Sequence, residues 1–143
     1  MKLVSVGSVA FDAIETPFGK TDKIVGGAGT FIALASSFFA KEQGLISVVG
    51  EDFPTETLDY LKSRGVNIDG VQIKQGEKTF FWSGKYHNDM NSRDTLVTEL
   101  NVLGTFDPIL PSSCQEADYL MLGNLSPQVQ LTVIERLEKR PKL

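Results

Sequence analysis

The sequence predicts an α/β fold with a doubly wound parallel sheet and an inserted β-hairpin. Short apolar runs, typical of buried strands, alternate along the chain with amphipathic stretches typical of helices. One segment breaks this alternation, because it combines a strand with an alternating aromatic face and a polar turn. The length of 143 residues suits a single domain.

The first third of the chain predicts two strands, a glycine-rich turn and a helix. Residues 3–7 form a short, mostly apolar run and are expected to be a buried strand. Residues 13–18 are expected to form an edge strand, because Pro17 cannot donate to a sheet ladder. Residues 23–25 lead into the turn Gly26-Gly27-Ala28-Gly29. The helix that follows has one apolar stripe at i, i+3, i+4 and i+7: Phe31, Leu34, Ala35 and Phe38.

The middle of the chain predicts a strand, a helix and a further strand. The strands are expected over residues 45–49, closed by Gly50, and over residues 71–73. The helix is expected over residues 54–64. Asp52 is expected to cap its N-terminus and Gly65 to cap its C-terminus. Leu58 and Leu61 are expected to face inward.

The inserted hairpin begins with residues 79–86, Thr-Phe-Phe-Trp-Ser-Gly-Lys-Tyr. In a strand, Phe80, Trp82 and Tyr86 share one face. Residues 88–93 are polar and predict a turn, and residues 95–100 can pair back as the second strand. The aromatic face can serve either as core beneath a loop or as a wall over a ligand.

The end of the chain predicts a buried strand over residues 118–122 and a last helix. Ser126 is a suitable N-terminal cap, and Pro127 fits the first turn. The inner face of this helix is expected to consist of Leu131, Ile134 and Leu137. No strand pattern follows, so we expect an unfinished sheet edge, as in half of a larger domain.

Composition excludes several functional classes. The net charge is −4, and the basic residues are scattered, so no nucleic-acid partner is expected. No apolar run reaches about 18 residues and no signal-peptide core is present, so we expect no membrane partner. With one cysteine, Cys114, and one histidine, His87, the chain forms no internal disulfide or zinc site on its own. A reducing, cytoplasmic location is therefore expected, and no metal site.

Two motifs allow a functional and a structural interpretation. The turn at residues 26–29 can bring backbone N–H groups close to a ligand, or it can simply pack a helix tightly on a strand. It does not match the dinucleotide pattern G-x-G-x-x-G. Asp12 follows the first strand, where its carboxylate can accept hydrogen bonds from substrate hydroxyls or cap a turn. A catalytic pair of His87 and Cys114 has no supporting pattern around either residue.

The order of these features resembles the N-terminal half of the ribokinase-like (PfkB) carbohydrate kinases. The resemblance is carried by Val6-Gly7-Ser8 with Asp12, by Gly26-Gly27 opening a helix, by Val49-Gly50-Glu51-Asp52-Phe53, by residues 61–66 (L-x-x-x-G-V) and by the hairpin. It spans nearly the whole chain. It implies a Rossmann-like, ribokinase-like fold in which residues 1–143 are the N-terminal portion. Lid segments are then expected around residues 12–25 and 71–102, and the C-terminal half of the fold is incomplete.

The resemblance also implies a function. Members of this family transfer the γ-phosphoryl group of ATP, with Mg²⁺, to a hydroxyl of a sugar or nucleoside. Asp12 would hold substrate hydroxyls, and Gly26 and Gly27 would contact the substrate through their backbone. The hairpin with Phe80, Trp82 and Tyr86 would be the lid, which excludes water on closing and can pair two subunits in a homodimer.

The sequence departs from the family pattern at the substrate site. Ala10 and Phe31 stand where family members carry asparagine, and Ala28 stands where they carry a polar residue. Near the end of the later strand, where the sugar contact is often an acid, this chain offers Asn124 or Leu125. The pocket is therefore expected to be less polar than a ribose pocket and to suit a nucleoside or a more apolar alcohol.

The family's catalytic signature, Asp-Thr-x-Gly-Ala-Gly-Asp, and its Asn-x-x-Glu motif do not occur in this sequence. The chain alone is therefore expected to have no kinase activity and no tight binding of ATP. Two interpretations remain. The chain is the substrate-binding and lid half of a sugar or nucleoside kinase, or it is a non-catalytic binding or dimerisation module derived from that fold.

Overall fold

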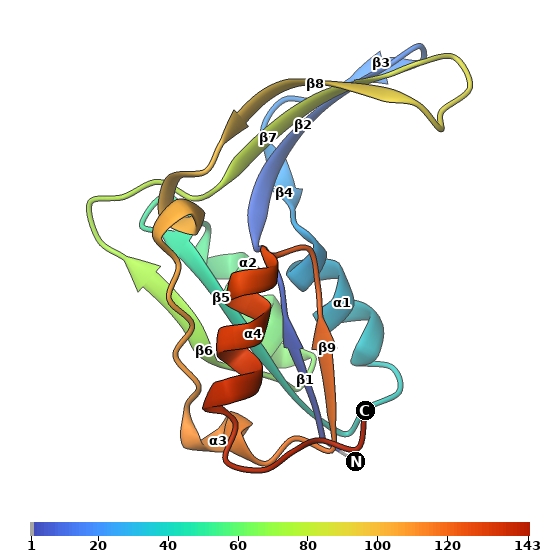
Figure 1. Ribbon diagram of the computed structural model, residues 1–143. Coiled ribbons are helices and arrows are strands. Elements are labelled where there is room, and N and C mark those ends of the chain that lie inside the picture. Colours follow the sequence, from blue (N-terminus) through green and yellow to red (C-terminus); the bar gives the residue numbers. More distant parts are fainter. Residues whose placement is uncertain (1) are drawn as a thin grey trace.

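The computed structural model describes residues 2–143 and contains two sheets (Figure 1). A parallel sheet has the strand order β6-β5-β1-β9. Its strands are β1 (Lys2–Val6), β5 (Glu42–Gly50), β6 (Val66–Lys74) and β9 (Tyr119–Leu122). This parallel sheet and its helices agree with the α/β class predicted from the sequence.

The second sheet, here called the projecting sheet, rises away from the carboxyl ends of β1 and β5 (Figure 1). Its order is β3-β2-β7-β8, and β4 pairs with β2. Its strands are β2 (Ala10–Thr16), β3 (Gly19–Lys20), β4 (Ile24–Gly26), β7 (Phe81–Tyr86) and β8 (Arg93–Glu99). β7 and β8 are antiparallel, so the hairpin predicted from the aromatic segment is present.

Helices cover both faces of the parallel sheet, and each face has its own core. The helical segments are α1 (Ala28–Ser36), α2 (Thr55–Ser63), η1 (Asn101–Thr105), α3 (Ser112–Gln115) and α4 (Pro127–Arg136). Ile46 and Val48 of β5 pack with residues of η1, α3 and α4. Leu45 and Val49 pack in the other core with residues of α1 and α2. This alternation along one buried strand is what a sheet covered on both faces requires.

The second strand differs from its prediction. β2 begins at Ala10 and pairs with β7 along one edge and with β3 and β4 along the other, so it is not an edge strand. Pro17 lies after the strand, in the turn to β3, where its missing N–H group interrupts no ladder.

The apolar stripe predicted for α1 is only partly buried, since Leu34 packs against the core but the two phenylalanines do not. The residues of this helix that are buried are Gly29, Thr30 and Ala33, whereas the side chains of Phe31 and Phe38 are 58% and 72% exposed. The Gly29 N–H group donates to the Ser8 carbonyl at 2.8 Å. A β-carbon on Gly7 would lie 2.8 Å from the Gly29 nitrogen. This backbone contact between glycines sets the rotation of the helix, and it turns the phenylalanines outward.

The predictions for α2 and α4 are partly confirmed and partly corrected. In α2, Leu58 and Leu61 are buried as predicted. Ser126 caps α4 as predicted, since its hydroxyl accepts from the Val129 N–H group at 3.3 Å. The buried residue of α4 is Val133, however, and Leu131 and Ile134 are exposed. Leu137, the third residue predicted to face inward, packs partly buried against the same core. Asp52 does not cap α2, which Pro54 precedes. Gly65 ends the α2 segment with a positive φ of 80°, as its predicted role requires.

The last residues return to the sheet edge. The Lys142 N–H group donates to the Asp118 carbonyl at 2.8 Å, and the Leu120 N–H group donates to the Leu143 carbonyl at 2.9 Å. The expected unfinished edge at β9 is therefore partly covered by backbone bonds to residues 142 and 143. Among residues 2–143, no helix is long and apolar enough to cross a membrane.

Candidate functional site

A cavity of about 390 Å³ lies where the projecting sheet meets the parallel sheet, and we call it the site cavity. It opens beside the carboxyl end of β1 and the start of α1, the position at which open α/β sheets bind ligands. Its lining residues are Ser8, Asp12, Gly27, Ala28, Phe31, Phe80, Trp82, Tyr86, Arg93 and Asn124.

The structure brings together the site residues predicted from the sequence, with one exception. Gly26 does not line the site cavity and instead lies against the Asp12 side chain. Sequence reasoning missed Ser8 and Arg93 as site residues. Ser8 was visible only as part of the Val6-Gly7-Ser8 motif, and Arg93 only as the end of a polar turn.

The Asp12 carboxyl is the acidic group of the site cavity. It extends from β2 and is half-buried. Burial raises the pKa of the Asp12 carboxyl above its ordinary value, and a backbone hydrogen bond from Gly27 acts in the opposite direction. A carboxylate has more lone pairs than one N–H group can use, so Asp12 can also accept bonds from ligand hydroxyls.

The glycine pair has a clear structural reason at each position. A β-carbon built on Gly26 overlaps the Asp12 carboxyl group. Gly27 has a φ of 91°, and a β-carbon there would lie 2.8 Å from the Ser8 carbonyl carbon and 2.9 Å from the Ala10 nitrogen. Tight packing therefore explains both glycines, and Gly27 additionally lines the site cavity.

A short hydrogen-bond chain joins the core elements around the site cavity. The Asn124 side-chain oxygen accepts from the Ser8 N–H group at 3.2 Å and from the Ser8 hydroxyl at 3.0 Å. The Ser8 hydroxyl accepts from the Ala28 N–H group at 3.2 Å. This chain links the end of β1, the start of α1 and the segment after β9. Because the Asn124 oxygen is engaged, its amide nitrogen is the group available to donate to a ligand.

Trp82 forms a flat wall on the projecting sheet. Its indole Nε1–H group donates to the Thr95 hydroxyl on β8 at 3.2 Å. A β-carbon on Gly84 would overlap the indole ring. The ring therefore lies over Gly84, where a larger residue would displace it. Trp82, Gly84 and Tyr86 share one face of β7 by strand alternation. The face with Phe80, Trp82 and Tyr86 is therefore a cavity wall, whereas Phe81 packs against the core.

The site cavity has few charged side chains. Its charged lining residues are Asp12 and Arg93. Among residues 2–143, no group of three or more acidic, histidine or cysteine side chains could hold a metal ion. His87 and Cys114 are not brought together, since His87 bonds Asp94 on the projecting sheet and Cys114 is buried in the core. The chemistry available in the described residues is recognition of a small polar molecule with a flat apolar part.

Comparison with known proteins supplies a family. A family model described as pfkB family carbohydrate kinase matches residues 1–141. The cytidine kinase of Thermococcus kodakarensis is 32% identical over 139 residues, which cover 96% of this chain and 49% of that protein.

Solved structures have the same fold at low sequence identity. The nucleoside kinase of Methanocaldococcus jannaschii, an archaeal member of the ribokinase family, matches with a TM-score of 0.74 and 20% identity over 98% of this chain and 50% of that protein. The nucleoside kinase of Burkholderia thailandensis in complex with inosine matches with a TM-score of 0.73 and 15% identity, covering 94% of this chain and 48% of that protein. A Cryptococcus neoformans ribokinase in complex with ADP matches with a TM-score of 0.70 and 21% identity, covering 95% and 45%. The chain spans about half the length of the proteins that it matches.

Proposed function

Because this chain belongs to the pfkB family of carbohydrate kinases, we propose that it forms the acceptor-binding core and the lid of an ATP-dependent nucleoside kinase. The fold is that of sugar and nucleoside kinases. In this proposal a nucleoside hydroxyl receives the γ-phosphoryl group. The preference for a nucleoside over a free sugar is supported by the aromatic wall and by the relative named as a cytidine kinase.

One observation carries the proposal: Asp12 and the aromatic pair Trp82 and Tyr86 line the same cavity of about 390 Å³. The Asp12 carboxylate accepts hydrogen bonds from the sugar hydroxyls. The aromatic rings stack on the flat face of the base, an interaction worth about 1–3 kcal/mol per base. A free sugar would use the carboxylate but would place no flat base against the rings.

The projecting sheet would act as the lid in this reaction. It carries Phe80, Trp82 and Tyr86 over the site cavity, so that bound substrate lies between this sheet and the start of α1. A closed lid excludes water, which suppresses hydrolysis of the phosphoryl donor. In the complete family domain, ATP and Mg²⁺ would supply and stabilise the transferring group. This chain contributes acceptor binding and lacks the family's catalytic signature.

Binding can be tested with intrinsic fluorescence, because Trp82 is the single tryptophan and lines the site cavity. We expect cytidine and inosine to change the emission in a saturable way and ribose to bind more weakly. Asp12→Asn should weaken nucleoside binding at least about tenfold, from loss of a charge-assisted bond. Asp59→Asn on the outside of α2 is the matched control and should leave binding unchanged. Absence of saturable binding by any nucleoside would contradict the proposal.

Catalysis needs a separate measurement. The 143-residue chain, supplied with ATP, Mg²⁺ and cytidine, should yield no phosphorylated product above background. A product whose formation is abolished by Asp12→Asn would show that the chain is a complete enzyme, and would overturn the proposed division of labour.

A non-catalytic dimerisation module is the second candidate, and β8 is the observation that favours it. β8 is the outer strand of the projecting sheet, and all of its residues are exposed, including Leu96. An exposed edge strand with apolar side chains can pair with a second copy of the chain. Sedimentation should then show a dimer that Leu96→Lys converts to monomer, whereas Lys74→Glu on β6 should not. A monomer at all concentrations would remove this candidate.

A further inference from the structure

We propose that Arg93 is a specificity-determining residue, which recognises hydrogen-bond acceptors on the edge of the substrate base. The inference rests on the proposed function, since it takes the nucleoside as given and names the group that selects among bases. Neither the family pattern considered above nor the predicted site residues include this arginine.

The first support is the position of the guanidinium group. Arg93 lines the site cavity from the start of β8, where it pairs with Tyr86 in the ladder of β7 and β8. Its guanidinium carbon lies 5.7 Å from the centroid of the Trp82 ring and 5.9 Å from the centroid of the Tyr86 ring. Such distances are typical of cation–π contacts. The cation therefore lies beside the surface on which a base would stack.

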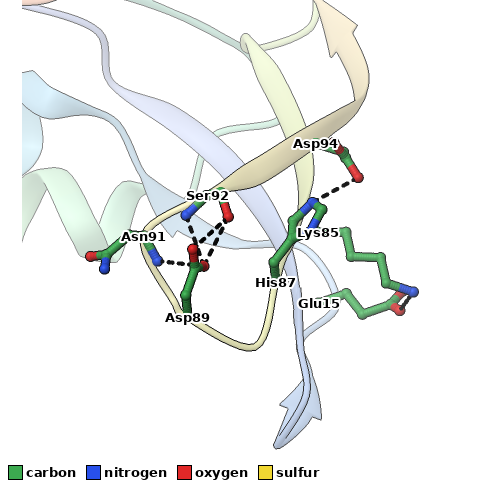
Figure 2. Close-up of polar contacts among 7 residues, drawn as sticks. All are labelled: Glu15, Lys85, His87, Asp89, Asn91, Ser92 and Asp94. Atoms are coloured by element: carbon green, nitrogen blue, oxygen red, sulfur yellow. Dashed lines mark hydrogen bonds and ion pairs between the residues drawn. The ribbon is translucent and has the colours of Figure 1, made fainter.

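The second support is the lack of an acidic partner, although acidic residues lie close to Arg93 in sequence. In the β7–β8 ladder, Arg93 pairs with Tyr86, and the adjacent residue Asp94 pairs with Lys85. Because successive residues of a strand point to opposite faces, Asp94 lies on the other face of the sheet from Arg93. There its carboxylate contacts the His87 ring at 3.0 Å (Figure 2). Lys85 on the same row contacts Glu15 at 2.7 Å.

The acidic residue of the hairpin turn is also engaged elsewhere. Asp89 accepts from the N–H groups of Asn91 and Ser92, each at 3.1 Å, and from the Ser92 hydroxyl at 2.8 Å (Figure 2). These bonds lower the pKa of Asp89 and keep it charged within its own turn. Within residues 2–143, no ion pair to the Arg93 side chain is found.

The third support is the separation of Arg93 from Asp12. β7 lies between β2 and β8 in the projecting sheet. Asp12 on β2 pairs with Trp82 on β7, and Arg93 on β8 pairs with Tyr86, which is four residues further along β7. Standard strand spacings put the two backbone positions about 10 Å apart across the sheet and about 13 Å apart along it. A hydroxyl-bearing ring near Asp12 therefore leaves space for a second ring near Arg93. This interval suits a ribose joined to a base.

The chemistry follows from the guanidinium group itself. Arginine carries N–H donors and no acceptor, so it pairs with carbonyl oxygens and ring nitrogens of a base. Asp12 prefers the opposite partners, since an ionised carboxylate accepts only. The two charges thus fix the orientation of the ligand, with the sugar hydroxyls at β2 and the acceptor edge of the base at β8. A base without acceptors would leave the guanidinium unpaired and would bind less tightly.

The test uses Arg93→Met in the 143-residue chain and three ligands: cytidine, ribose, and a ribosyl benzene whose ring stacks but has no acceptor. We expect Arg93→Met to raise the dissociation constant for cytidine at least about tenfold, as loss of a charged donor implies. The constants for ribose and for ribosyl benzene should change less than about twofold. Arg93→Lys, which keeps the charge, should recover part of the cytidine affinity. Arg140→Met near the C-terminus is the matched control.

Each outcome separates the two proposals. Unchanged cytidine affinity in Arg93→Met overturns the role of Arg93 while leaving the nucleoside proposal intact. An equal loss for all three ligands also overturns it, because the arginine would then act only by holding the projecting sheet in place. If the unaltered chain binds no nucleoside, the proposed function fails and the inference fails with it. Thermal unfolding of each variant shows that it is folded.

Discussion

The contact between Gly26 and Asp12 predicts a strong energetic coupling. A methyl group at Gly26 overlaps the Asp12 carboxyl, and the three atoms nearest to that methyl all belong to Asp12. Gly26 lies outside the set of glycines with positive φ, so its backbone suits alanine. The expected cost of Gly26→Ala therefore comes from displacing one carboxyl group.

The magnitude follows from what the displaced carboxyl loses. If the Asp12 carboxyl stays in place, its overlap with the new methyl group lowers the free energy of unfolding by about 1–3 kcal/mol. Moving the carboxyl away from the Gly27 N–H group breaks a hydrogen bond to a charged acceptor, which is worth about 1.5–3 kcal/mol. We expect Gly26→Ala to lower the free energy of unfolding by about 1–3 kcal/mol. In an Asp12→Ala background the same change should stabilise by about 0.4–1 kcal/mol, because alanine restricts the unfolded chain.

The assay is a double-mutant cycle measured by urea unfolding, with far-UV circular dichroism as the signal. Gly19→Ala is the matched control in the same sheet, because a β-carbon there meets no atom within 4 Å. Its effect should be the same with and without Asp12. If Gly26→Ala costs the same free energy in both backgrounds, the overlap with Asp12 is not its cause and the reasoning is refuted.

Three further predictions concern the same region. Gly27→Ala should destabilise by about 1–3 kcal/mol even with Asp12→Ala, because the positive φ and the contact with Ser8 do not involve that carboxyl; urea unfolding of the double variant checks this. Burial raises the pKa of Asp12, so the folded state binds that proton more tightly than the unfolded state, and stability should fall as the pH rises from the ordinary pKa to the raised one. Asp12→Asn should therefore be more stable than the unaltered chain at pH 7, and thermal unfolding should show this difference vanishing below about pH 4. Asp52→Ala should lower the free energy of unfolding by about 1–3 kcal/mol, because Asp52 accepts from the Thr79 N–H group at 2.8 Å and contacts Lys23 at 3.1 Å. The control Asp22→Ala should change the free energy of unfolding, measured in urea, by less than about 0.5 kcal/mol.

Local patterns predicted where strands and helices form, and for α2 they also predicted the buried face, with Leu58 and Leu61. They did not predict the buried faces of α1 and α4. In α4 the predicted cap at Ser126 is confirmed, because a cap depends on residues within one turn. Of the residues predicted to face inward, Leu137 packs against the core, but Leu131 and Ile134 are exposed. Helical spacing alone did not show that Val133 is the buried residue. In α1 the contact between Gly7 and Gly29 decides the rotation, and these residues are far apart in sequence.

The candidate site shows the same division. The resemblance to the family, together with residue types in the predicted positions, pointed to Asp12, Gly27, Asn124 and the aromatic face, and these residues line one cavity. Arg93 was not identifiable, because a charged residue at the end of a polar turn is usually a solvated surface residue. Only the ladder register places it opposite Tyr86 and sends Asp94 to the other face.

Sequence patterns were enough to predict the α/β class, the hairpin and the family, because these depend on hydrophobic period, turn chemistry and the order of short motifs. The tertiary structure alone decided which faces are buried, why Gly26 cannot carry a side chain, and which charges share the site cavity. These properties depend on contacts between residues distant in the chain. Such contacts arise only when β2, β7 and β8 align above the ends of the parallel strands, and no local pattern encodes that alignment (Figure 1).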